Sequence, residues 1–240
     1  MERRNVSAVA IIDQEVTDQT KECCGSPEPL FRRVSERNDP EVLTDIYRND
    51  TNIAIWKRDV SAELIAAVDD FINTNEMKRT MLAITAKNAH EELRKAIGTE
   101  KNIAPLVEDM AQLIDMFCCL FDLKRAGVRL TSMDQAMCPR FHVDKIPCRL
   151  VSTYQGIATD WLPNHLVDRT KLGAGSEGKP DDISGLFHDL SDIQCLNRGD
   201  VALLKGEFWE GNEGAGLIHR SPPLPAGEHR LLLTLDFIDL

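Results

Sequence analysis

Apolar positions in the first half of the chain recur at helical spacing. Ser61 is a typical N-cap residue, and the apolar residues behind it lie three or four positions apart, as on one face of a helix. Residues 103–125 carry a broader apolar stripe, which predicts a helix that packs on a sheet. Gly127 is expected to end that helix. The pattern predicts helices that begin near residues 41 and 61 and span 87–97 and 103–125, with one strand at 52–56.

From Val128 onward the spacing changes to that of strands. Apolar segments of strand length alternate with turn residues, and a loop rich in glycine and proline spans residues 163–185. The predicted strands cover 128–131, 141–144, 149–154, 192–196, 200–205, 216–219 and 229–237. We therefore expect an α+β chain in three regions, which are a poorly ordered lead-in (1–40), a helical N-terminal region (41–126) and a β region (127–240).

Composition narrows the class of protein. The chain is 42% hydrophobic and 28% charged, as in ordinary globular domains. A net charge of −11 argues against non-specific binding to nucleic acid, which needs a basic surface. No apolar run approaches the length of a membrane span, and the run near the start is too short for a secretory signal. Seven cysteines, an odd number, fit reduced thiols, so we expect a cytoplasmic protein.

Two motifs in the β region suggest a metal site. His142 and Asp144 are two positions apart, so in an extended strand both side chains lie on one face. His219 follows at the exit of an apolar stretch. Two histidines and one carboxylate form the facial triad that holds Fe(II) with open coordination positions. His-x-Asp alone is weak evidence, because both residues are common in loops.

Arg230 strengthens the metal hypothesis. It opens an almost continuously apolar run, 231–237, that predicts a buried strand. An arginine that enters a core strand needs an anionic partner, and a 2-oxo acid bound to the metal would present its distal carboxylate nearby. The alternative is a salt bridge at the surface. Tyr154, on the strand after His142 and Asp144, is a second candidate for binding the co-substrate carboxylate, with simple packing as its alternative.

The cysteines leave the identity of the metal open. Cys138 and Cys148 flank the His-x-Asp segment, and thiolates favour zinc over iron. We treat both as alternative metal ligands, although the chain has no Cys-x-x-Cys pair of the kind that announces a structural zinc site. Cys23 and Cys24 lie in the lead-in, where no third ligand is evident. Cys118 and its neighbour on the predicted helix point about 100° apart and are expected to pack in the core.

Several other polar and aromatic residues have two interpretations each. Arg149 and Lys205 line the mouth of the site or extend along apolar surface to water. Trp161 and Trp209 shape a substrate pocket or pack in the core. Arg220 is expected to point away from His219 if the strand continues there. The remaining histidines of the β region have no ligand spacing and are expected at the surface: His165, His188 and His229.

Two resemblances rest on these residues. The order His142-x-Asp144, then His219, then Arg230 resembles the Fe(II)- and 2-oxoglutarate-dependent oxygenases, which implies a double-stranded β-helix of jelly-roll or cupin type under an N-terminal helical layer. Four segments resemble a bacterial family known only as a domain of unknown function: CPRFHVD (138–144), RLVSTYQG (149–156), GDVALLKGE (199–207) and HRSP (219–222). That family resemblance implies genes near those of zinc homeostasis and a GTPase metallochaperone as a partner.

The resemblances lead to two functions. In the first, Fe(II) and 2-oxoglutarate support hydroxylation of a small-molecule or protein substrate, with His142, Asp144 and His219 as ligands and Arg230 on the co-substrate. In the second, the same scaffold binds zinc and stores or transfers it without catalysis. A third variant is a scaffold with a vestigial site. Binding of 2-oxoglutarate separates the first function from the others.

Overall fold

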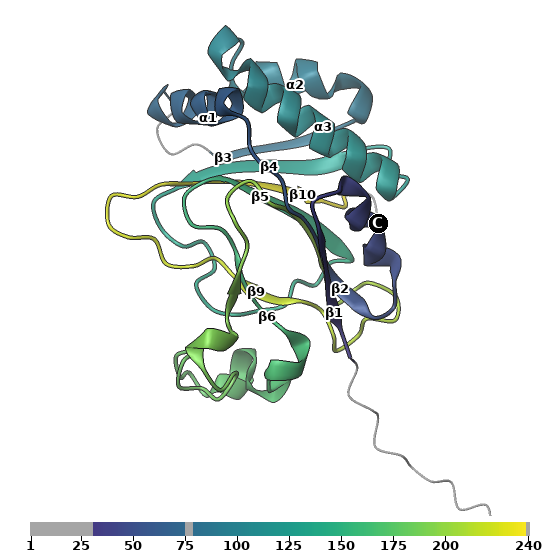
Figure 1. Cartoon of the computed structure of the whole chain (residues 1–240), viewed down its shortest axis with the longest axis vertical. Coiled ribbons are helices and arrows are strands. Elements are labelled where there is room, and N and C mark those ends of the chain that lie inside the picture. The colour runs from purple at the N-terminus through teal and green to yellow at the C-terminus, as the bar shows by residue number, and fades with distance from the viewer. Residues whose placement is uncertain (1–30, 75–78, 239–240) are drawn as a thin grey trace, which may run out of the picture.

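The computed structural model describes residues 31–74 and 79–238. A seven-stranded sheet has the order β1-β2-β8-β5-β10-β4-β3, and a three-stranded sheet has the order β7-β6-β9 (Figure 1). All paired strands run antiparallel except β1 and β2. The large sheet comprises β1 (Arg33–Arg37), β2 (Thr51–Trp56), β3 (Arg79–Ile84), β4 (Ala126–Met133), β5 (Cys148–Gln155), β8 (Val201–Lys205) and β10 (Arg230–Asp236). The small sheet comprises β6 (Asp160–Leu162), β7 (Gln194–Cys195) and β9 (Ile218–Arg220).

Three α-helices lie together on one side of the large sheet (Figure 1). They are α1 (Ala62–Thr74), α2 (Ala89–Ile97) and α3 (Ala104–Leu120), and the 3-10 helix η1 (Pro40–Tyr47) precedes β2. The hydroxyl of Ser61 accepts a hydrogen bond from the amide of Leu64 at 3.2 Å, which confirms Ser61 as a cap. The buried face of α3 supplies Leu106, Met110, Leu113, Ile114 and Phe117 to the main core between helices and sheet.

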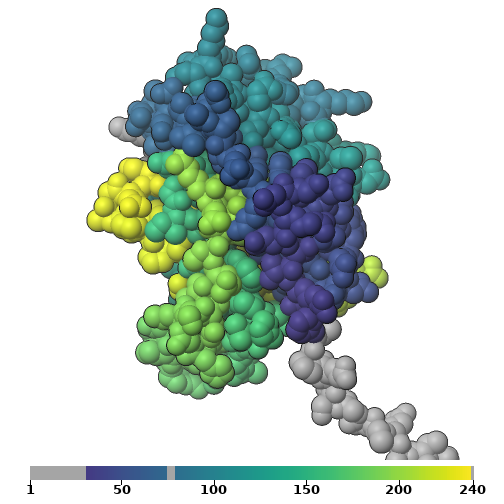
Figure 2. Space-filling model, viewed as in Figure 1, coloured from purple at the N-terminus to yellow at the C-terminus, as the bar shows by residue number. Residues whose placement is uncertain are grey.

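The other face of the large sheet packs on the small sheet. A second core joins them, with Val151 and Leu232 from the large sheet and Trp161 and Leu217 from the other side. Alternation along each strand therefore decides which core a side chain enters. The short 3-10 helices η4 (Asn164–Leu166), η5 (Arg169–Lys171) and η6 (Gly173–Ser176) belong to a lobe that projects at the lower end of Figure 2. No helix in the described ranges is long and apolar enough to cross a membrane.

Three local predictions were wrong, and one strand was missed. Residues 33–37, expected in the lead-in, form β1, because the polar strand gains parallel pairing with β2 at the sheet edge. Residues 79–84, with no assignment from the sequence, form β3. Residues 141–144 are not a strand, since they pair only in an isolated bridge at His142. The helix α3 ends at Leu120 and not at Gly127, because Asp122 adopts a φ of 50° and closes it.

The other predicted helices and strands are confirmed within a few residues. The lead-in contributes β1 to the large sheet, and the helical region contributes β2 and β3. The division into three regions stays a prediction. The pair Cys23-Cys24 lies outside the described residues.

Candidate metal and anion site

The three predicted ligands lie together. Suitable ligand atoms of His142, Asp144 and His219 all lie within 4.8 Å of one another. The backbones of His142 and His219 exchange two hydrogen bonds of 3.0 Å, so the bridge between a loop and β9 sets the two imidazoles side by side. Each imidazole Nε2 faces the carboxylate of Asp144, at 3.6 Å from His142 and 3.5 Å from His219. The site needs no continuous strand at 141–144.

The loop that carries Asp144 is fixed by its backbone. The amide of Glu207 donates to the carbonyl oxygen of Asp144 at 2.9 Å, and the amide of Gly206 donates to that of Pro147 at 2.8 Å. A Cβ at Gly206 would stand 2.8 Å from the Asp144 carbonyl oxygen and nearer still to that of Ile146. Glycine at 206 is therefore required by close packing of two backbones.

Hydrogen bonds orient both imidazoles. The Nδ1 of His142 lies 3.0 Å from the carbonyl oxygen of Arg140, and the Nδ1 of His219 lies 3.2 Å from that of Leu217. A carbonyl accepts only, so each Nδ1 carries a proton, and each Nε2 is the nitrogen that faces Asp144 and can bind a metal once it is deprotonated. Burial, and then repulsion from His219, lowers the pKa of His142, which favours the neutral imidazole that binds a metal.

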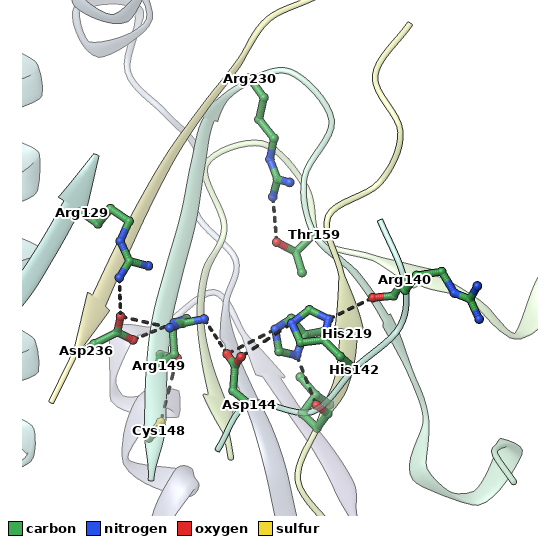
Figure 3. A network of polar contacts seen from close by, with 11 residues as sticks. Arg129, Arg140, His142, Asp144, Cys148, Arg149, Thr159, His219, Arg230 and Asp236 are labelled. Atoms are coloured by element: carbon green, nitrogen blue, oxygen red, sulfur yellow. Dashed lines mark hydrogen bonds and ion pairs between the residues drawn. The ribbon is translucent and has the colours of Figure 1, made fainter. Parts of the chain in front are cut away.

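Asp144 is held as a carboxylate. Burial raises its pKa, but the hydrogen bond to His219 and the charges of His219, Arg149 and His142 outweigh burial and lower the pKa to about 2. Arg149 donates from Nη1 to the Oδ2 of Asp144 at 2.6 Å. The same guanidinium donates two hydrogen bonds, of 2.7 and 3.1 Å, to the carboxylate of Asp236. Figure 3 shows this chain of contacts from Asp236 through Arg149 to Asp144 and the histidines.

Arg230 is fully buried in the wall of the same pocket. Its guanidinium donates to the hydroxyls of Ser221 (2.6 Å), Thr159 (2.8 Å) and Thr153 (3.3 Å). No carboxylate among the described residues lies within ion-pair distance of it, and its Nε has no hydrogen-bond partner there. Burial lowers the pKa of Arg230 to about 10, against a smaller opposing effect of Asp160. Within the described part of the chain, the hydrogen-bond partners of this buried cation are therefore neutral hydroxyl groups.

Tyr154 does not line this pocket. Its hydroxyl donates to the Oδ2 of Asp109 on α3 at 2.6 Å, and its ring belongs to the core between sheet and helices. The cause is alternation along β5, which sends Arg149 and Val151 to the pocket and Tyr154 to the opposite face. The assignment of Tyr154 to the co-substrate carboxylate is wrong, and its hydroxyl acts in a structural contact.

The two cysteines differ. Cys148 is fully buried in the core on the helical side of the sheet, and burial raises the pKa of its thiol far above the ordinary value, so it is not a metal ligand in this arrangement. Cys138 is exposed in the pocket wall. Among the described residues the group of ligand atoms around Asp144 includes only the two histidines, so Cys138 borders the cluster without joining it.

Of the remaining candidates, Lys205 and Trp161 lie outside the pocket, whereas Arg220 lines it. Lys205 is buried on the helical side, where its Nζ donates to the carbonyl of Arg48 at 2.9 Å and lies over the ring of Trp209. Trp161 packs in the core between the sheets. Arg220 donates to Asp160 at 3.0 Å and lies over the ring of Phe141, so an aspartate already neutralises it. The exposed histidines lie outside the cluster, as expected: His165, His188 and His229.

Comparisons with known proteins place the chain in a family. A family model described as "Protein of unknown function (DUF1826)" matches residues 37–236, which is well over half of the chain. The chain belongs to this family. A comparison with curated proteins finds no match to the DUF1826 chain.

Solved structures align with the DUF1826 chain at low sequence identity. The dioxygenase for auxin oxidation from rice aligns with a TM-score of 0.51 at 12% identity, over 86% of this chain and 83% of that one. The Arabidopsis thaliana dioxygenase for auxin oxidation 1, described as a 2-oxoglutarate binary complex, aligns at 0.48 and 10%, over 88% and 94%. A prolyl-4-hydroxylase from Pseudomonas putida aligns at 0.40 and 14%, over 82% and 96%. The likeness to the rice enzyme shows a shared mixed fold of helices and a large sheet.

The structure also adds pocket residues that the sequence analysis missed in the DUF1826 chain. Ser221 and Thr159 hold Arg230, and Arg129 lines the pocket from β4. A signal for Ser221 was present, because it lies two positions after His219 and so on the same face of an extended segment. Thr159 carries no such signal, since its loop reaches Arg230 only through the packing of the small sheet on the large one.

Proposed function

We propose that the protein is an Fe(II)- and 2-oxoglutarate-dependent oxygenase. The observation that carries the proposal is one pocket that combines the His142, Asp144 and His219 cluster with Arg230, a buried cation without a carboxylate partner among the described residues. A buried charge without a counter-ion is costly, and a bound anion removes that cost. The pocket therefore suits a ligand that chelates a metal at one end and presents a carboxylate at the other.

The ligand set fits Fe(II). Two neutral imidazoles and one carboxylate on one side of an ion leave coordination positions for further ligands. Arg140 and Leu217 supply the carbonyl oxygens that fix the Nδ1 protons, as outer partners of metal-bound histidines do. Bound Fe(II) with a 2-oxo acid would supply the oxidising chemistry. His142, Asp144 and His219 would hold that ion in place.

Arg230 would hold the far carboxylate of 2-oxoglutarate. A guanidinium offers two parallel N–H donors to a carboxylate, and it stays charged when buried. Ser221 and Thr159 keep the side chain extended toward the pocket through bonds of 2.6 and 2.8 Å. The apolar neighbours Val151 and Leu232 would exclude water from the same wall and strengthen the attraction between charges.

The fold supports the proposal in a general way. The two facing sheets and the order of the motifs along the chain suit a double-stranded β-helix, with His219 on β9 and Arg230 opening β10. The rice dioxygenase for auxin oxidation has a similar fold. Fold alone does not fix an activity, so the proposal rests on the pocket.

The metal cluster is tested by single substitutions. We expect His142→Ala, Asp144→Ala and His219→Ala to abolish tight binding of one Fe(II) ion in anaerobic titrations and to leave the far-UV circular dichroism spectrum unchanged. His188→Ala, which removes an exposed histidine outside the cluster, is the matched control and should bind Fe(II) like the parent. Parent-like binding by His219→Ala would refute the triad.

The second candidate is a zinc-binding or zinc-trafficking protein with the same cluster. The exposed thiol of Cys138 in the pocket wall favours it, because thiolates prefer zinc. In that case a GTPase metallochaperone is the partner to test. Binding of 2-oxoglutarate to the iron-loaded protein distinguishes the two, since a metal carrier has no use for a co-substrate.

A further inference from the structure

A second arginine faces the pocket, away from Arg230. Arg129 on β4 stands opposite Thr234 on β10, and both line the pocket wall. Arg230 stands opposite Met133. On β10, Arg230 lies four residues before Thr234, so their backbones are about 13 Å apart along the strand. The two arginines therefore enter the pocket from different positions along the sheet.

Two polar atoms, one on Arg129 and one on Thr234, lack hydrogen-bond partners among the described residues. These are the Nε of Arg129 and the hydroxyl of Thr234, and both are buried. Thr234 is only 6% exposed. The nearest acid to Arg129 is Asp236, 3.8 Å from Nη2, and Asp236 is already engaged by Arg149 at 2.7 and 3.1 Å. Buried polar atoms normally have hydrogen-bond partners, so the Nε of Arg129 and the hydroxyl of Thr234 can each donate to an oxygen atom of a ligand.

Charge balance in the pocket points to an anion. Four arginines line the pocket, namely Arg129, Arg149, Arg220 and Arg230. Asp144, Asp160 and Asp236 contact them, and Asp181, which lies 3.9 Å from Arg220, also pairs with Arg140 at 2.7 Å. With Arg140 and Asp181 included, five arginines face four aspartates. One positive charge is left over. A divalent metal adds two, and doubly charged 2-oxoglutarate removes two. The loaded pocket would keep one positive charge, which favours a ligand with one negative charge.

The pocket face of the sheet is open beside Arg129. Its neighbour across the strand pair is Met81 on β3, a residue that is 60% exposed. A ligand can therefore reach Arg129 from solvent along the β3 edge, without passing Arg230, which is fully buried.

We propose that Arg129 and Thr234 form an anion subsite that holds the organic substrate by a carboxylate group. Calling this ligand the substrate rests on the proposed oxygenase function, whereas the subsite rests on the contacts of Arg129 and Thr234. The Nε–Nη2 edge of the guanidinium offers two donors to the carboxylate. The hydroxyl of Thr234 supplies a third.

The test uses the full chain, loaded anaerobically with Fe(II) and 2-oxoglutarate, and titrated by calorimetry with propanoate and, separately, inorganic phosphate. With Arg230 occupied by 2-oxoglutarate, we expect propanoate to bind the parent at one site. Arg129→Gln should weaken propanoate binding at least tenfold while the affinity for 2-oxoglutarate stays unchanged. Arg94→Gln, which removes the same charge from the exposed side of α2, is the control and should match the parent.

A second variant separates binding from folding. Thr234→Val keeps the shape of the side chain and removes a hydroxyl that has no partner, so the midpoint of urea unfolding should not fall. Propanoate affinity should nevertheless drop. A structural role for the hydroxyl would instead lower the unfolding midpoint and leave propanoate binding intact, and that result would contradict the subsite.

The remaining outcomes are distinct. Unchanged propanoate binding in Arg129→Gln, or no propanoate binding by the parent, overturns the subsite. Loss of 2-oxoglutarate binding in Arg129→Gln assigns Arg129 to the co-substrate and also overturns it. Arg129-dependent binding of phosphate in preference to propanoate overturns the carboxylate assignment. If the parent binds no 2-oxoglutarate, the oxygenase proposal fails. The subsite is then decided by titrating propanoate into two metal-loaded variants, Arg230→Gln and the double variant Arg129→Gln with Arg230→Gln.

Discussion

Gly206→Ala is expected to disable the metal site through the backbone alone. The added Cβ would stand 2.8 Å from the carbonyl oxygen of Asp144 and nearer to that of Ile146, whereas real contacts of this kind essentially never fall below 3.0 Å. The loop must therefore shift by more than about 0.2 Å, the tolerance of metal–ligand distances. The shift weakens two hydrogen bonds, worth about 1 kcal/mol each. Overpacking adds roughly 1–3 kcal/mol to the loss of up to about 2 kcal/mol from the hydrogen bonds, so stability should fall by about 1–5 kcal/mol.

The assay measures two quantities for each variant, the Fe(II) affinity by anaerobic titration and the stability by urea unfolding. We expect Fe(II) affinity to fall by about 10–100-fold, as when an outer support of a metal site is lost. Gly211→Ala is the control, because Gly211 has a φ of +76° and open space around its Cβ position. It should cost about 1–2 kcal/mol of stability and leave Fe(II) affinity unchanged. Parent-like Fe(II) affinity in Gly206→Ala would refute the claim that this packing positions Asp144.

Three further predictions follow from the corrected positions of side chains. Tyr154→Phe should lower the free energy of unfolding by about 1.5–3 kcal/mol, the value of a hydrogen bond to the charged Asp109, and should leave 2-oxoglutarate binding unchanged. Weaker 2-oxoglutarate binding at unchanged stability would instead show that Tyr154 contacts the co-substrate. Burial lowers the pKa of Lys205 to about 8, so folding releases a proton between pH 8 and the ordinary pKa of 10.5, and stability should rise with pH in that window. Urea unfolding of Lys205→Met should lack that rise, and an identical pH profile would show that the pKa of Lys205 is not lowered in the folded protein. Cys138→Ser and Cys148→Ser should retain one metal ion by elemental analysis, and loss in either variant would favour a thiolate zinc site.

The positions of the elements were largely predictable, because each depends on a local pattern. The helical stripe in α3, the Ser61 cap and the apolar runs of β8 and β10 all carry their own signal in the sequence. The polar strand β1 has no such signal. Its pairing with β2 brings together main-chain groups rather than an apolar face, so side-chain periodicity cannot reveal it.

The ligand cluster was predictable for a partly mistaken reason. Strand alternation was expected to align His142 with Asp144, but the loop is held by its bridge to His219 and by Glu207. Tyr154 was assigned wrongly although side chains alternate along β5. Arg149 and Tyr154 are an odd number of residues apart, so in a regular strand they lie on opposite faces. The partners of Arg230 come from separate segments, and only tertiary packing unites them.

The most direct test of the oxygenase proposal is the visible charge-transfer band of the Fe(II)·2-oxoglutarate complex, measured anaerobically in the parent and in variants of Arg230. The parent should show the band at saturating 2-oxoglutarate. Arg230→Gln should weaken 2-oxoglutarate binding by about 2–5 kcal/mol, as for a desolvated charge pair, and Arg230→Lys should recover part of it. Fe(II) binding should survive both changes. An iron-loaded parent that shows neither band nor heat of 2-oxoglutarate binding would contradict the proposal and favour the metal-carrier function.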